Sequence, residues 1–374
     1  MPAAPVSCGS GSGPADSASV LQATTRTHTE RRDRKERKAS RVRIKMFASR
    51  PLRPLRSVCL SIGADYTFRA VPRLDLLTVG DAFQDLIFVG LPHMPRQGEE
   101  LRSARFVSTI GGGAVITATA GARLGLRTAI VSALSRDASL ALRRDGVQVV
   151  NVRRASETPA VTVSLSTQHD RGLVTFDGVN DRLEARLPAA MARLHARHVH
   201  FAFAPRECAR WIRIAQRLRA RGVTTSWDFG WTPPLRARPG FRALVGAADV
   251  IFVNEAEALL YSRTRRRAAA IAYWRRAARN TVIKLGPRGS RWVTGADDVS
   301  APAPRVRAVD TTGAGDAFNG GFLFAWLDGR SPRECLRAAN FVGAQSTQAA
   351  GGVIALPTRL LRGAGRASRP GELR

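Results

Sequence analysis

Short apolar segments alternate with longer amphipathic segments through most of the chain. Short segments of apolar and β-prone residues occur at 74–80, 128–134, 199–204, 224–229, 248–253 and 281–283. Between them lie turns that contain glycine and stretches with apolar residues at helical spacing, such as 316–327. Short apolar strands that alternate with helices are typical of an α/β protein. The sequence therefore predicts an α/β fold.

One pair of segments departs from this alternation. Residues 161–166 and 173–176 are β-prone and are joined by Gln168-His169-Asp170-Arg171-Gly172, which is a hairpin pattern. An ordinary hairpin within the main sheet is the alternative, but an antiparallel insertion in a βα series usually forms a layer of its own. Residues 101–108 could pair with the hairpin, so we expect a small accessory sheet.

The two ends of the chain lack the periodic pattern. Residues 1–70 pass from a Gly/Ser/Ala/Thr-rich stretch into charge runs at 31–38 and 41–45, which are usually solvated and disordered. An organellar transit peptide is an alternative, although Asp33 and Glu36 argue against it. We expect a disordered extension over 1–70, one domain over 71–360 and a disordered tail over 361–374.

The chain is strongly basic, with a net charge of +30 over 374 residues and a pI of about 11.7. A nucleic-acid-binding protein would explain such a charge. However, the excess is almost entirely arginine, and it is spread over predicted helix surfaces without alternating aromatic residues. We therefore rank nucleic-acid binding as a minor alternative to compositional bias.

Several other classes of protein are disfavoured. No apolar run reaches the length of a membrane span, and the small-residue segment 111–122 stops at Arg123. The histidines at 195, 198 and 200 lie at the entry to an apolar strand, where structural histidines are commoner than metal ligands. The cysteines show no C-x-x-C spacing, so a reduced, cytoplasmic location is expected for Cys8, Cys59, Cys208 and Cys335.

The run from Val309 to Phe318 carries the strongest chemical signal. Glycines at 313 and 315 expose backbone amides at the start of a helix, where unpaired donors and the helix dipole favour an anion. Asp316 could be a helix cap. A second acid and two hydroxyls at 310–312 make the cap interpretation less favoured, since an anion cradle with a base is what phosphoryl transfer to an alcohol requires.

The run Asp310-Thr-Thr-Gly-Ala-Gly-Asp-Ala-Phe318 resembles the C-terminal signature of the ribokinase-like (PfkB) carbohydrate kinases. The resemblance extends over roughly 74–358. It implies a ribokinase-like fold, in which a mostly parallel, twisted sheet has helices on both faces and a small β-sheet lid comes from about 91–110 and 160–178. It also implies ATP-dependent phosphorylation of a hydroxyl of a sugar or sugar-like molecule.

The same resemblance assigns roles in catalysis. Asp316 would be the general base, and the amides of the turn at Gly313, Ala314 and Gly315 would form the anion hole. This role needs no strong pKa shift of Asp316, because a loose transition state requires late proton removal and orientation more than strong basicity.

Acceptor contacts are also implied by the resemblance. Asp85 matches an acid that binds sugar hydroxyls, and the glycines after Ile110 match a pair that brings the backbone close to the sugar. Two positions depart from the family, because Ile116 stands where Asn is usual and Phe203 lies where ribose-binding members often have Glu. The expected acceptor-binding residues are Phe83, Asp85, Gly111, Gly112, Gly113, Ile116, Phe203 and Asp316.

Asn254 and Glu257 match the family's N-x-x-E motif, which orients magnesium and phosphates through water, although N-x-x-E alone is common as a capping pattern. Lys284 stands in the ATP-contacting loop and is the only lysine after Lys45. The expected ATP-binding residues are Asn254, Lys284, Gly286, Arg288, Gly289, Gly313, Gly315 and Asn340. A requirement for a monovalent cation stays open.

Three alternatives remain open. A nucleoside kinase of the same fold is the runner-up, since apolar residues at 116 and 203 could accommodate a base. A catalytically idle nucleotide-binding regulator is disfavoured by the intact Asp316, Asn254 and Glu257. The basic nucleic-acid-binding protein is the third. The oligomeric state, a homodimer included, is not fixed by the sequence.

Overall fold

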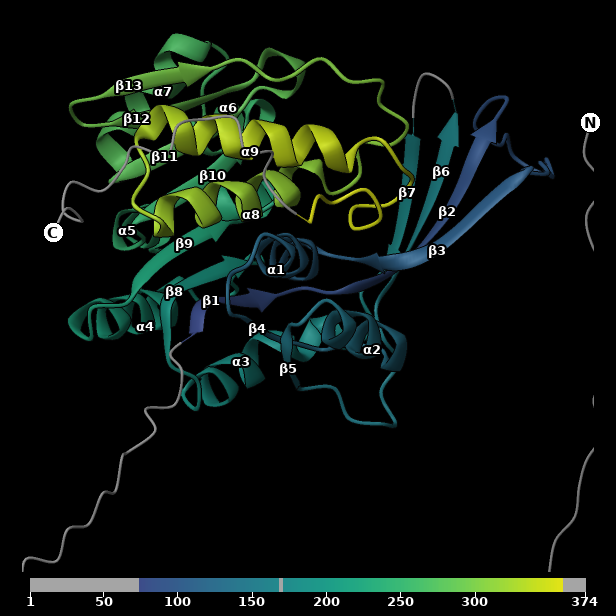
Figure 1. Ribbon diagram of the computed structural model, residues 1–374, viewed down its shortest axis with the longest axis horizontal. Coiled ribbons are helices and arrows are strands. Elements are labelled where there is room, and N and C mark those ends of the chain that lie inside the picture. The colour runs from purple at the N-terminus through teal and green to yellow at the C-terminus, as the bar shows by residue number, and fades with distance from the viewer. Residues whose placement is uncertain (1–73, 168–170, 359–374) are drawn as a thin grey trace, which may run out of the picture. The chain divides into compact units, whose positions relative to one another are not determined.

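A computed structural model describes residues 74–167 and 171–358. The predictions for 1–70 and 361–374 lie outside the described residues, as does the centre of the hairpin loop. Within the described part, one large sheet with flanking helices carries a smaller, separate sheet (Figure 1).

The large sheet has nine strands in the order β13-β12-β11-β10-β9-β8-β1-β4-β5. The seven strands from β11 to β5 run parallel, while β12 and β13 are antiparallel additions at one edge. The mostly parallel sheet that the sequence led us to expect is therefore confirmed. The strands are β1 (Leu74–Gly80), β4 (Thr128–Ser132), β5 (Gln148–Asn151), β8 (Ala196–Ala202), β9 (Thr224–Asp228), β10 (Val250–Asn254), β11 (Asn280–Lys284), β12 (Ser290–Thr294) and β13 (Asp298–Ala301).

Both faces of this sheet are buried, because neighbouring residues of each strand enter different cores. Leu77 packs into the core that holds α3 to α7, whereas Leu76 packs into a core that holds α8 and α9. One face carries α3 (Leu183–Met191), α4 (Cys208–Ala220), α5 (Phe241–Ala247), α6 (Glu255–Ser262) and α7 (Arg267–Ala277). The other carries α1 (Gly113–Arg123), α2 (Arg136–Arg144), α8 (Ala314–Leu327) and α9 (Pro332–Ser346).

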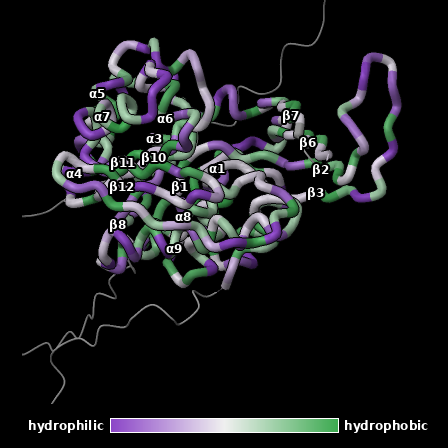
Figure 2. Tube along the Cα trace, turned by 90° about the horizontal axis from the view of Figure 1, so that it is seen from above, coloured by the Kyte–Doolittle hydropathy of each residue, from purple (hydrophilic) through white to green (hydrophobic). Residues whose placement is uncertain are grey.

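The small sheet has four strands in the order β3-β2-β6-β7 and projects from the body of the domain (Figures 1 and 2). It is formed by β2 (Phe83–Leu91), β3 (Arg105–Gly111), β6 (Val161–Thr167) and β7 (Arg171–Phe176). The lid was expected to start near residue 91, and this bound is wrong because all of β2 belongs to it. The β6–β7 hairpin pairs with β2, so β3 lies one strand further away than expected.

Close contact between α1 and α8 brings the two glycine-containing motifs together. A Cβ on Gly320 of α8 would lie 2.5 Å from the Ala120 Cβ and 3.1 Å from the Thr117 carbonyl oxygen of α1. A side chain at residue 320 would therefore push the helices apart. The absence of one lets the N-terminal ends of α1 and α8 approach each other at the carboxyl edge of the sheet, where ligands bind in open α/β folds.

No described helix is both long and apolar enough to cross a membrane. Short 3₁₀ turns complete the described chain at η1 (Gly178–Arg182), η2 (Pro233–Ala237) and η3 (Gly286–Arg288).

Candidate active site

Asp310 stabilises the turn that precedes α8. Its Oδ1 accepts hydrogen bonds from the Thr312 amide at 2.9 Å and the Thr312 hydroxyl at 2.7 Å. Its Oδ2 accepts from the Gly351 amide at 2.8 Å. The second acid of the motif is therefore engaged in holding the turn in place.

The start of α8 exposes backbone amides. Gly313 takes the N-cap position with φ of 70°, and no side chain caps the helix. The amides of Ala314 and Asp316 already donate, at 3.3 Å to the Thr311 carbonyl and at 3.0 Å to the Gly313 carbonyl. Within the described residues, no hydrogen bond is found for the amides of Gly313 and Gly315. These two donors are available to an anion, which is fewer than the sequence motif suggested.

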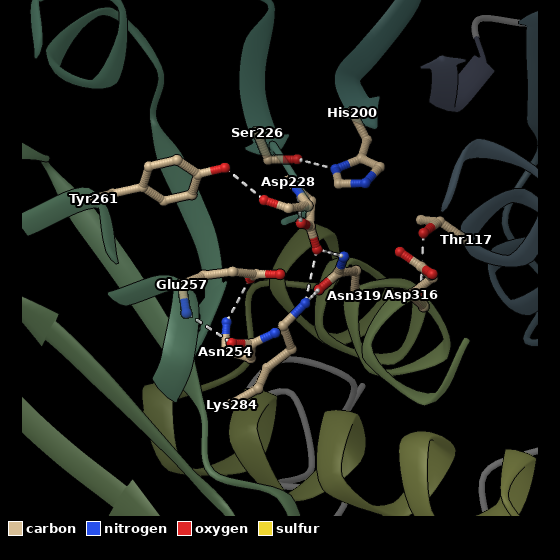
Figure 3. A network of polar contacts seen from close by, with 11 residues as sticks. Thr117, His200, Ser226, Asp228, Asn254, Glu257, Tyr261, Lys284, Asp316 and Asn319 are labelled. Carbon is tan, nitrogen blue, oxygen red and sulfur yellow. Dashed lines mark hydrogen bonds and ion pairs between the residues drawn. The ribbon is translucent and has the colours of Figure 1, made fainter. Parts of the chain in front are cut away.

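Asp316 does not act as a cap. It lies three residues after the N-cap, and its carboxylate makes no hydrogen bond or ion pair within the described residues. The backbone is fixed instead, because the Thr117 hydroxyl of α1 donates to the Asp316 carbonyl oxygen at 3.0 Å (Figure 3). The carboxylate is thus held in position while both of its oxygens remain available for chemistry.

Glycines at the start of α1 leave room for two carboxylates. A Cβ on Gly111 would lie 1.8 Å from Oδ2 of Asp85, and a Cβ on Gly113 would lie 3.0 Å from Oδ1 of Asp316. Gly112 has φ of 98°, and a Cβ there would meet the Asp81 carbonyl at 2.5 Å. The structure therefore brings Asp85 and Asp316 to the same glycine segment, 111–113, from β2 and α8.

Both carboxyls have unusual acidity. Burial raises the pKa of Asp85 to about 7, with a further contribution from the charge of Asp310. Burial also raises the pKa of Asp316 to about 7, where repulsion by Asp228 adds to the effect and the charge of Lys284 opposes it. The mechanism does not need this shift of the Asp316 pKa. It arises because the carboxylate is buried in a crowded acidic site that the linear sequence does not display.

Asn254 and Glu257 form a capping box at the start of α6. The Asn254 Oδ1 accepts from the Glu257 amide and the Glu257 Oε2 accepts from the Asn254 amide, each at 2.8 Å. Burial and the nearby Asp228 raise the pKa of Glu257. No cluster of three or more potential metal ligands is found among the described side chains. Contact of this pair with a phosphate-bound magnesium ion through water remains a prediction.

Residues of the expected ATP loop have structural partners. Arg288 pairs with Glu255, and Gly286 has φ of 58°. A Cβ on Gly289 would lie 2.1 Å from the Ala301 carbonyl oxygen, so only glycine fits there. The buried Asn340 of α9 donates a hydrogen bond to the same Ala301 carbonyl, with a distance of 3.0 Å. These contacts order the loop, while contact with a nucleotide remains a prediction.

Lys284 is placed in the centre of the site, not in the loop beside it. Its Nζ lies 2.7 Å from Oδ2 of Asp228 at the end of β9, and both side chains are largely buried (Figure 3). Asn319 of α8 donates to the same Oδ2 at 2.8 Å. The sequence offered a signal for this pair only in the rarity of lysine, and it offered none for Asn319.

The two residues that depart from the family pattern are packed in the interior. Ile116 is buried against the glycine turns, where its Cδ1 lies 2.3 Å from a Cβ built on Gly313 and 2.5 Å from one on Gly352. The Phe203 ring packs among aromatic side chains, including Trp211 at 4.9 Å between ring centroids. Phe83 pairs with Gly111 at the start of β2. Their roles in acceptor binding therefore remain predictions.

Comparison with known proteins identifies the family. A model described as pfkB family carbohydrate kinase matches residues 73–359. The chain belongs to this family of kinases.

Individual relatives and solved structures agree with this assignment. The kinase is 26% identical over 337 residues to a ribokinase of Arabidopsis thaliana, covering 83% of this chain and 88% of the relative. It is 27% identical over 276 residues to a nucleoside kinase of Methanothermobacter thermautotrophicus, covering 72% and 87%. The structure of Arabidopsis thaliana ribokinase complexed with ribose and ATP matches with a TM-score of 0.61 at 23% identity, covering 76% of this chain and 96% of that one. The ribokinase-like fold is therefore confirmed.

Proposed function

We propose that this kinase transfers the γ-phosphoryl group of ATP to a hydroxyl of a sugar or sugar-like molecule, with Asp316 as the general base. One observation carries the proposal. The Asp316 carboxylate has no partner of its own among the described residues, yet it lies at a helix start beside the unpaired amides of Gly313 and Gly315. A base next to an anion cradle is the arrangement that phosphoryl transfer to an alcohol needs.

The chemistry follows from this geometry. An Asp316 oxygen accepts the proton of the acceptor hydroxyl while the hydroxyl oxygen forms its bond to the γ-phosphorus. The bond between the γ-phosphorus and the oxygen that bridges it to the β-phosphorus breaks, and that oxygen leaves with ADP. The amides of Gly313 and Gly315 and the helix dipole favour the negative charge on the group in transit. Lys284, whose Nζ lies 3.0 Å from a Cβ built on Gly315, adds a positive charge to the same turn.

Nucleotide binding is assigned to the neighbouring strand ends. Asn254 and Lys284 pair at the carboxyl ends of β10 and β11, and the 286–289 turn follows β11. Asn340 donates to the Ala301 carbonyl, next to Gly289 of that turn. Magnesium would offset the charge of the ATP phosphates. Glu257 would orient water around that ion through the carboxylate oxygen that the capping box does not use.

Asp85 favours an acceptor that carries a second hydroxyl near the reacting one, as sugars and the ribose of nucleosides both do. It is 5% exposed and shares the 111–113 segment with Asp316, so a molecule whose hydroxyl reaches Asp316 can present a second hydroxyl to Asp85. A nucleoside kinase remains the second candidate, because one relative carries that name. Ile116 and Phe203 supply no polar group to the acceptor, so we expect simple ribose not to be the preferred substrate.

A cytoplasmic location is proposed from the cysteines. Cys208 and Cys335 are buried and free within the described part of the chain, as expected for a reducing compartment.

An ATP-consumption screen tests the function. Purified protein with magnesium and ATP is offered a panel of sugars, sugar acids, amino sugars and nucleosides, and ADP release is measured against a blank without acceptor. We expect release that depends on one or a few sugar-like acceptors. Release with nucleosides alone would favour the second candidate, and no acceptor-dependent release across the panel would contradict the proposal.

A further inference from the structure

Three neighbouring strands deliver the polar side chains at the centre of the site. Phe252 of β10 pairs with Asp228 of β9, and Asn254 pairs with Lys284 of β11, so these parallel strands end at one edge. The Lys284–Asp228 ion pair measures 2.7 Å, with side chains 12% and 8% exposed. Removing two charges from water to this extent carries a high desolvation cost, so a stabilising function alone is a poor explanation for the pair.

Asn319 links this pair to the catalytic helix. It follows Asp316 by three residues on α8 and is fully buried. Its Nδ2 donates to Asp228 Oδ2 at 2.8 Å, and its Oδ1 lies 3.5 Å from Lys284 Nζ. The ammonium thus has a partner on the sheet and a partner on the helix, which together fix its position (Figure 3).

The ammonium lies against the anion-binding turn. A Cβ added to Gly315 would come 3.0 Å from Lys284 Nζ. Burial opposes the charge on Lys284, but the carboxylates of Asp228, Glu257 and Asp316 raise its pKa above the ordinary value, so it stays protonated. The charge is therefore held one residue away from the general base.

The histidines behind Asp228 do not share this role. The Thr224 hydroxyl donates to a backbone carbonyl at 3.3 Å and therefore accepts from His198 Nδ1 at 2.9 Å. Ser226 then donates to His198 Nε2 at 2.7 Å and accepts from His200 Nδ1 at 2.8 Å. Each ring carries one proton and is neutral, in agreement with the lowering of the His200 pKa to about 4 by burial. Lys284 is left as the counter-ion of Asp228.

We infer that Asp228 and Asn319 are positioning residues for phosphoryl transfer, because they hold Lys284 Nζ beside Gly315, where its charge serves both the transferring group and Asp316. The inference rests on the proposed function. The charged groups that face Asp316 are Asp85 from β2, Asp228 from β9, Glu257 from α6 and Lys284 from β11.

A double-mutant cycle tests the inference. Lys284→Met is expected to lower kcat by about 10²-fold or more, the cost of losing one preorganised group that stabilises transition-state charge. Asp228→Asn is expected to lower kcat by about 10-fold in the wild-type background and by less than about 3-fold in the Lys284→Met background, since its effect passes through Lys284. Equal fold-losses in both backgrounds would overturn the inference.

The pH profile of kcat/KM for the acceptor, at saturating magnesium and ATP, gives a readout that a structural role would not move. Lys284→Met should shift the acidic limb upward by about one unit, because a cation near Asp316 is lost. No shift in Lys284→Met, or a downward one, would overturn the inference. If Asp228→Asn fails to fold, the shift in Lys284→Met decides the question.

Asp249→Asn provides the matched control. It removes a partly buried carboxylate that pairs with Arg219 at 2.9 Å and accepts a hydrogen bond from the Thr225 amide at the opposite end of the sheet. We expect a lower melting temperature with kcat and the pH profile unchanged. A wild-type protein without acceptor-dependent turnover would contradict the proposed function itself and this inference with it. If the wild-type protein turns over but Asp228→Asn lowers kcat by the same factor with and without Lys284→Met, the inference is overturned and the proposed function stands.

Discussion

At the scale of single residues, the site depends on buried carboxyl groups whose ionisation is unfavourable. Asp85 and Asp316 both have a pKa of about 7, chiefly because of burial. The proposed mechanism needs an ionised Asp316 to accept the acceptor proton, so we expect the site to become competent as this group loses its proton. Lys284 is the cation that limits the shift at Asp316.

The pH dependence of activity follows from that value. The kcat/KM for the acceptor should rise as pH increases through about 7, since Asp316 must be ionised. The measurement is a profile from pH 5 to 9 under saturating ATP. A rate that is flat across this range would show that no group with a pKa of about 7 controls catalysis.

Stability should respond to pH in the opposite direction. The folded pKa of Asp316 is above its unfolded value of about 4, so between about pH 4 and 7 the folded state keeps a proton that the unfolded chain releases. Stability is therefore lost as pH rises through this window. Asp316→Asn should raise the melting temperature more at pH 8 than at pH 5. An equal change at both values would contradict the raised pKa.

Glycine 111 tests the geometry around Asp85. Gly111→Ala would place a Cβ 1.8 Å from Asp85 Oδ2 and displace the carboxylate. We expect kcat/KM for the acceptor to fall by about 10²-fold, the cost of misplacing a reacting partner by about 1 Å. ATP affinity should be retained. Gly295→Ala is the control, because a Cβ there meets nothing within 4 Å. If Gly111→Ala lowers kcat/KM for the acceptor and the affinity for ATP equally, the assignment of Asp85 to acceptor binding is wrong.

At the scale of elements, α1 and α8 must cross closely for the two motifs to meet. Gly320→Ala should force them apart and destabilise the fold by about 1–3 kcal/mol, with a loss of turnover. Thermal unfolding and kcat are the measurements. Gly246→Ala in α5 is the control, since its Cβ would make an ordinary contact at 3.5 Å. Similar effects of both substitutions would mean that Gly320 does not set the crossing.

The elements themselves were largely predictable from the sequence. Strands such as β4 and β10 are largely apolar runs bounded by turns, which a sheet buried on both faces requires. The bounds of the lid were missed because β2 follows β1 after only the two residues 81–82, so no turn signal separates them. The pairing of β2 with β6 is a long-range contact that local pattern does not encode.

The site was predictable where a motif is local. The glycines and acids at 310–316 and 111–113 could be identified because their spacing is fixed within one turn. Asp228 and Asn319 could not be identified, since their partnership with Lys284 joins residues 56 and 35 positions away from it. The interior packing of Ile116 and Phe203 likewise depends on which elements surround them.

At the scale of the whole molecule, the N-terminal extension is predicted to be dispensable. Residues 1–70 lack a periodic apolar pattern and cannot bury enough surface to offset the entropy of ordering. Deleting them should leave the melting temperature and kcat essentially unchanged. The comparison is between full-length and truncated protein. A large loss of either property would assign the extension a structural or catalytic role.

The net charge of +30 has one further test. Salt-sensitive binding to DNA without acceptor-dependent ATP turnover would favour the nucleic-acid-binding alternative. We expect acceptor-dependent turnover instead, because the acids, amides and ammonium of the site are arranged for phosphoryl transfer.

The turnover of Asp316→Asn tests the central claim most directly. The substitution keeps the size of the side chain and removes the base, while the helix start keeps its Gly313 cap. We predict that kcat falls by about 10²–10⁴-fold, with the folded structure intact and ATP affinity retained or improved. Normal turnover by a correctly folded Asp316→Asn protein would contradict the account, because the phosphoryl transfer proposed here requires that carboxylate.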